Sequence, residues 1–115
     1  MFVSSVRIMW PTGADQPLNA LLLTLKFEAA FELIEVRSGE EGQQKPYRYK
    51  DQPTPQFTAE SAREEFKRIL TDIKGQKGAN VRKNLEALSD KIGKVWNADG
   101  EAQRELEAFL KKYVD

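Results

Sequence analysis

Residues 6–25 have the sequence VRIMWPTGADQPLNALLLTL, in which a strand pattern passes through a turn into a helix pattern. Val6, Ile8 and Trp10 alternate with other residues, which predicts a strand over residues 2–10 with these three side chains on its buried face. The Pro-Thr-Gly-Ala segment that follows predicts a turn. This order of strand, turn and helix favours an α/β fold.

Four leucines after the turn recur at helical spacing and predict a helix over about residues 16–27. Residues 30–36 mix apolar and acidic positions less regularly. We predict a half-buried strand there, and a helix continued from Lys26 to Leu33 remains the competing interpretation.

The composition changes between residues 38 and 57, where glycine, proline and glutamine predict a loop of about twenty residues. A loop this long is typical of a functional or mobile segment. Within it, Tyr47-Arg48-Tyr49-Lys50 alternates aromatic and basic side chains. Such residues can stack on a base or a sugar. The interpretation that we favour is that the aromatic rings anchor the loop on the core.

The rest of the chain is predicted to be helical. Thr58 is expected to cap one helix and Gly75 to end it at a C′ position, Gly78 to open the next, and residues 97–100 to separate the last. The segment from Gly75 to Gly78 is expected to be a turn rather than an anion site. The predicted apolar stripes are Ala62, Phe66, Ile69, Leu70 and Ile73; Val81, Leu85, Leu88, Ile92, Val95 and Trp96; and Leu106, Phe109, Leu110 and Tyr113.

The predicted fold class is therefore α/β and predominantly helical, with one or two short parallel strands and four helices in a partial Rossmann-like half-domain. We expect residues 1–115 to form a single domain. Its parts would be a strand–helix–strand unit over 1–37, the loop over 38–57 and a three-helix segment over 58–115.

The composition restricts the function. Eighteen basic and eighteen acidic side chains cancel, so we expect no nucleic acid and no anionic membrane as a partner. The longest apolar run is too short to span a bilayer, and no signal peptide is evident. The sequence has no cysteine, which fits a reducing compartment, and we expect a cytoplasmic location. The lack of histidine removes the commonest zinc ligand and the usual general base, and we expect no metal site and no catalytic residue.

Two groups of polar residues are candidate sites. Glu40-Glu41 and Glu64-Glu65 are expected to lie on solvated faces, paired with basic residues. Asp15 and Gln16 follow the predicted strand at its carboxyl end, where open α/β sheets bind ligands. Together they offer acceptors and donors suited to a vicinal diol of a sugar. Asp15 is also a plausible helix N-cap, which the local pattern favours, and both roles are compatible.

The run from Trp10 to Ala20, Trp-Pro-Thr-Gly-Ala-Asp-Gln-Pro-Leu-Asn-Ala, resembles the end of the signature box of UDP-dependent glycosyltransferases, and fungal members most. The order of elements after it is similar as well, so the resemblance covers nearly the whole chain. It implies a GT-B fold, with this chain corresponding to the C-terminal part of the nucleotide-sugar-binding domain. It also implies that Asp15 and Gln16 bind hydroxyls of the donor sugar and that Trp10 lies beside them.

The sequence also departs from that family. The family's catalytic histidine, His-Gly-rich pyrophosphate loop, uracil-stacking tryptophan and ribose-binding acid have no counterpart here, and Arg7 is unexpected in a buried strand. The resemblance therefore implies a donor-sugar-contacting fragment that is inactive alone and needs a partner. UDP-sugar would be its substrate, with no cofactor. The alternative is a repurposed, non-catalytic interaction or carbohydrate-binding protein. Because the strands would lack cover, we expect self-association or a complementary glycosyltransferase chain.

Overall fold

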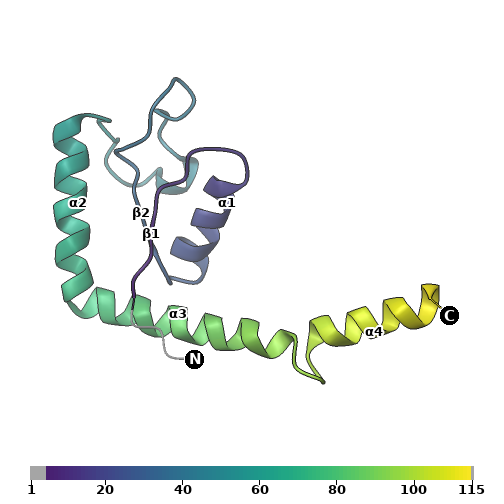
Figure 1. Cartoon of the computed structure of the whole chain (residues 1–115). Coiled ribbons are helices and arrows are strands. Elements are labelled where there is room, and N and C mark those ends of the chain that lie inside the picture. The colour runs from purple at the N-terminus through teal and green to yellow at the C-terminus, as the bar shows by residue number, and fades with distance from the viewer. Residues whose placement is uncertain (1–4, 115) are drawn as a thin grey trace.

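The computed structural model describes residues 5–114, apart from the side chain of Arg48, so the start of the predicted strand over 2–10 lies outside the described residues. Within this range it has four α-helices, two strands, a π-helical turn η1 and a 3₁₀ turn η2 (Figure 1). This confirms the predicted α/β class with two short strands and four helices. The elements in chain order are β1 (Ile8–Met9), α1 (Gln16–Leu21), η1 (Leu22–Lys26), β2 (Phe31–Glu32), η2 (Tyr47–Tyr49), α2 (Ala59–Lys74), α3 (Gln76–Val95) and α4 (Glu101–Tyr113).

The two strands pair in parallel, with Ile8 opposite Phe31. The backbone N–H of Phe31 donates to the carbonyl of Arg7 at 2.9 Å, and that of Leu33 donates to Met9 at the same distance. A strand is therefore confirmed within the predicted range 30–36, although it covers only Phe31–Glu32, and the competing helix ends at Lys26. Figure 1 shows α1 and α2 flanking the two strands.

The core lies where β2 meets α2 and α3. Phe31 and Leu33 of the strand segment pack with Ile69 of α2 and Val81 of α3, and all four side chains are buried. Partly buried apolar residues complete this cluster: Val6, Ile8, Val36 and Ile73. The core thus holds the end of β2 against the long helices, and this arrangement positions the cleft described below.

The start of α2 is held by a capping box. The Thr58 hydroxyl accepts from the backbone N–H of Ser61, and the Ser61 hydroxyl accepts in return from the backbone N–H of Thr58. Reciprocal bonds of this kind satisfy N–H groups that have no partner within the helix. The predicted cap at Thr58 is confirmed.

The corner between α2 and α3 differs from the prediction. Gly75 ends α2 with an extended backbone, φ −98° and ψ −164°, rather than in the left-handed C′ geometry that we expected. It is also the N-cap of α3, so Gly78 lies inside that helix and does not open it. A Cβ atom at Gly78 would lie 2.0 Å from the carbonyl oxygen of Ile73. Glycine is needed at position 78 because the two helices approach so closely there.

Several predicted apolar stripes are exposed in the described structure. Leu18 of α1 is 58% exposed and Trp96, expected in the core, is 64% exposed. No residue of α4 is buried. Figure 1 shows the end of α3 and all of α4 extending away from the strands. The spacing of these apolar residues predicted the helices correctly. The prediction that the side chains are buried is wrong, because within residues 5–114 no other element covers them.

None of the helices in the described part of the chain is long and apolar enough to cross a membrane.

Candidate functional site

The sugar-binding residues predicted from the sequence lie in the turn between β1 and α1. The side-chain oxygen of Gln16 accepts from both the backbone N–H and the hydroxyl of Thr12, each at 2.9 Å. These two bonds close the turn and fix the position of the Gln16 amide. Its nitrogen makes no hydrogen bond with any described residue of the chain, and Gln16 is exposed.

Asp15 occupies the N-cap position of α1 but makes no side-chain cap bond. Its backbone is helical, φ −79° and ψ −9°, whereas a capping side chain requires an extended backbone. One carboxylate oxygen, Oδ2, instead accepts from the Asn19 amide at 3.1 Å. The predicted capping bond is wrong, and Oδ1 is left without a partner among residues 5–114.

Trp10 precedes this turn and is 60% exposed. We expected it on the buried face of the strand, and this is wrong because β1 ends at Met9, so Trp10 lies beyond the paired residues. The exposed indole, the Asp15 oxygen and the Gln16 nitrogen all belong to one short exposed segment at the carboxyl end of β1. An aromatic ring, a donor and an acceptor are groups suited to binding a sugar.

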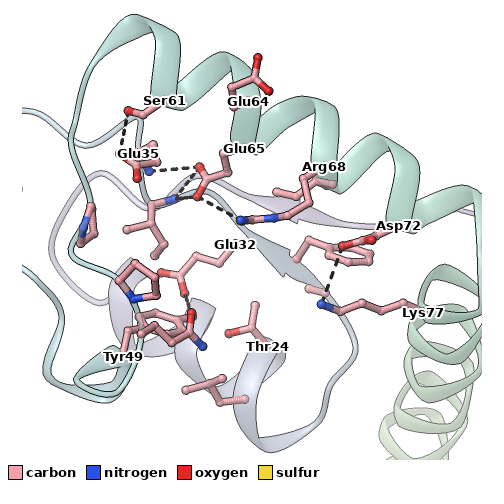
Figure 2. A pocket seen from close by; sticks show the side chains of 18 of the residues that line it. Thr24, Glu32, Glu35, Tyr49, Ser61, Glu64, Glu65, Arg68, Asp72 and Lys77 are labelled. Carbon is pink, nitrogen blue, oxygen red and sulfur yellow. Dashed lines mark hydrogen bonds and ion pairs between the residues drawn. The ribbon is translucent and has the colours of Figure 1, made fainter.

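A cleft of about 1000 Å³ lies elsewhere, between β2, the loop that follows η2, and helices α2 and α3 (Figure 2). Trp10, Asp15 and Gln16 do not line it. Many of the side chains that line the cleft are polar. Those labelled in Figure 2 are Thr24, Glu32, Glu35, Tyr49, Ser61, Glu64, Glu65, Arg68, Asp72 and Lys77.

Glu65 is a buried residue of this cleft, only 6% exposed. It accepts from the backbone N–H of Ile34 at 2.9 Å and from that of Glu35 at 3.1 Å (Figure 2). Burial raises the pKa of Glu65 against the lowering effect of these backbone bonds and of Arg68, which lies 4.0 Å away. The sequence prediction placed Glu65 on a solvated face, and this is wrong because two backbone donors at the end of β2 require its oxygens.

Glu35 binds the end of the long loop. Its carboxylate accepts from the backbone N–H of Phe57 at 2.7 Å, from that of Gln56 at 3.0 Å and from the Ser61 hydroxyl at 2.8 Å. Phe57 has a positive φ of 55°, a strained backbone for a non-glycine residue that persists only where its surroundings hold it. Glu35 supplies that support, so both Glu35 and Glu65 serve the structure.

The loop is also anchored through one of its two tyrosines. The Tyr49 hydroxyl donates to the Glu32 carboxylate at 2.9 Å, and Arg37 pairs with the other oxygen of Glu32 at 3.0 Å. Tyr47 is 83% exposed. The favoured interpretation, that the loop aromatics anchor on the core, is correct for Tyr49 and wrong for Tyr47.

A pH dependence follows from the raised pKa of Glu65. Between the ordinary value of 4.5 and the higher folded value, the folded protein binds more protons than the unfolded chain. The free energy of unfolding of the wild type, relative to Glu65→Gln, should therefore rise as the pH falls through this window. Urea unfolding from neutral pH down to the ordinary glutamate range measures it. Glu64→Gln keeps Glu65, so its free energy of unfolding should follow the wild type in this pH range. A flat or opposite trend in the difference between the wild type and Glu65→Gln would contradict the burial of the charge.

No group of three potential metal-ligating side chains lies together in the part of the chain that the structure describes. Some charged residues of the cleft form ion pairs instead, such as Lys77 with Asp72 at 3.9 Å.

Comparison with known proteins returns a curated relative, a UDP-glycosyltransferase of Hericium erinaceus. It is 30% identical to this chain over 105 residues, which are 90% of the chain and 20% of the relative. The chain thus spans about a fifth of the length of that protein. This similarity supports a relationship to the glycosyltransferases. No family model matches the chain. No solved structure matches it either.

Proposed function

We propose that this chain contributes the donor-sugar-contacting part of a UDP-glycosyltransferase. The observation that carries the proposal is the exposed turn at the carboxyl end of β1, where Asp15 and Gln16 each keep one polar atom without a partner among the described residues. The relationship to the glycosyltransferase of Hericium erinaceus supports it, since the similarity covers 90% of the chain.

In this proposal Asp15 Oδ1 accepts a hydrogen bond from one hydroxyl of the donor hexose. The Gln16 amide nitrogen donates to the neighbouring hydroxyl oxygen, and its own oxygen stays bound to Thr12. Trp10 packs its ring beside the sugar. The fixed Gln16 amide matters because a group already held in place loses little conformational entropy on binding.

The chain on its own is proposed to bind the donor weakly and to transfer no sugar. It has no histidine to act as general base. Glu35 and Glu65 of the cleft already accept backbone hydrogen bonds, and Glu32 accepts from Tyr49 and Arg37. A further segment must hold the nucleotide and supply the base, either within a longer polypeptide or from a second chain. Positioning of both substrates is what makes transfer fast.

The test is a titration of the isotopically labelled protein with UDP-glucose, followed through the indole N–H signals of its two tryptophans. The signal of Trp10 should shift with a dissociation constant on the order of 1 mM, because a few hydrogen bonds at about 1 kcal/mol each supply little more. The signal of Trp96, at the far end of α3, should stay in place.

Asp15→Ala should abolish the shift at Trp10, while the matched control Asp99→Ala, in the turn before α4, should leave it unchanged. No response to any UDP-sugar from a folded protein would overturn the proposal. A response to free glycans without UDP would instead favour the repurposed carbohydrate-binding protein.

A further inference from the structure

Helix α4 presents an apolar face that nothing in the described chain covers. Leu106, Phe109, Leu110 and Tyr113 recur at helical spacing and are 42%, 55%, 44% and 64% exposed. The rings of Phe109 and Tyr113 lie 5.0 Å apart, so the face is continuous along the helix. An isolated helix of 13 residues is marginal in water, and most helices of this length depend on packing of their apolar face.

The charges beside this face select its partner. On a helical wheel Glu105 and Lys112 lie along the same edge of the apolar stripe, seven residues apart, and Glu107 lies along the opposite edge. When two identical helices pair in antiparallel fashion about a two-fold axis, like edges meet. Glu105 then faces the partner's Lys112, and the same pair forms again on the other side of the axis.

A parallel pair would be less favourable. It would bring Glu105 of each helix against the edge that carries Glu107 of the other, which gives two contacts between like charges and no attraction. The antiparallel pair brings Glu107 near its symmetry mate once, beside the two attractive pairs of Glu105 with Lys112. The chain as a whole is neutral, and no net charge therefore opposes association of two copies. We propose that two copies of this chain associate through the apolar faces of α4, antiparallel and related by a two-fold axis.

In that arrangement the axis passes between positions 108 and 109, midway between Glu105 and Lys112. Phe109 approaches its symmetry mate there, and Leu106 lies opposite the partner's Leu110. A two-fold contact of this kind is closed, so association stops at the dimer. The interface does not include Trp10, Asp15 or Gln16, and the inference stands independently of the proposed function.

Sedimentation analysis of the whole chain tests the proposal. One helix pair buries less than the roughly 1,200 Å² of a typical stable interface, so we expect a monomer–dimer equilibrium with a dissociation constant on the order of 100 µM. Phe109→Ser should weaken it about tenfold or more, because it removes the apolar contact at the axis. Leu18→Ser, at an equally exposed leucine of α1, should leave it unchanged.

The charge pair gives the sharper test. Lys112→Glu alone should weaken the dimer about fivefold, because it places like charges opposite each other twice in the interface. The double change Glu105→Lys with Lys112→Glu should restore the affinity of the dimer, since opposite charges then face each other again with their positions exchanged. Circular dichroism checks that each variant keeps its helices. A monomer at all concentrations, or a double variant that stays as weak as the single one, would overturn the proposal.

Discussion

Gly78→Ala should lower the free energy of unfolding by about 3 kcal/mol, although it adds a single methyl group. A Cβ atom at this position would lie 2.0 Å from the carbonyl oxygen of Ile73 and 2.5 Å from its carbonyl carbon. These are backbone atoms and cannot rotate away, so the corner between α2 and α3 must open. Opening it pulls Ile69 and Val81 apart in the core. Urea unfolding followed by circular dichroism measures the loss.

The same helix offers a control of opposite sign. A Cβ atom at Gly93 would meet nothing within 4 Å, and Gly93 lies in the last turn of α3. Gly93→Ala should therefore stabilise the protein by about 0.5–1 kcal/mol, because alanine loses less backbone entropy than glycine in a helix. If both substitutions changed the free energy of unfolding equally, the backbones of α2 and α3 would not approach as closely at Gly78 as the structure shows.

The elements that the sequence predicts well are those that local rules determine. The capping box at Thr58 needs only Ser61, three residues away, and the helices follow from the spacing of their apolar residues. The short parallel strands were also predicted from their residue types. Gly75 and Gly78 were misplaced because glycine after a helix suggests a left-handed cap. Here Gly75 is the extended residue that joins the two helices, and Gly78 lies where they approach closely.

Burial was harder to predict than secondary structure. In α2 the expected stripe includes Phe66 and Leu70, yet these are 40% and 47% exposed, and the structure buries Glu65 beside Ile69. The one available signal was that Glu65 lies four residues before Ile69, on the same helix face. The backbone groups that need it belong to Ile34 and Glu35, about thirty residues away, and no local pattern reveals them.

The candidate sugar site was predictable in position and not in detail. Its place at the carboxyl end of a strand follows from the strand–turn–helix pattern. The bond from Thr12 to the Gln16 oxygen and the exposure of Trp10 follow from how the turn closes, which the residue types alone do not determine. The contact between Asp15 and Asn19 likewise replaced the expected cap because the backbone at Asp15 is helical.

Glu65→Leu should lower the free energy of unfolding by about 2–3 kcal/mol. Leucine fills much the same space but accepts no hydrogen bond, so the backbone N–H groups of Ile34 and Glu35 lose their acceptor in a partly buried place. Each such group costs about 1 kcal/mol or more when left unsatisfied. The end of β2 would then separate from α2. Urea unfolding measures the change.

Glu64→Leu is the matched control, because the side chain of Glu64 is 71% exposed and its partner is the equally exposed Lys67. Its effect should stay within about 0.5 kcal/mol. Glu65→Gln should fall between the two, since it keeps one acceptor and gives up the buried charge. If Glu65→Leu lowered the free energy of unfolding no more than Glu64→Leu, the backbone N–H groups of Ile34 and Glu35 would have another acceptor. The buried carboxylate of Glu65 would then destabilise the fold, because its burial, which raises its pKa, would not be offset by hydrogen bonds that the fold needs.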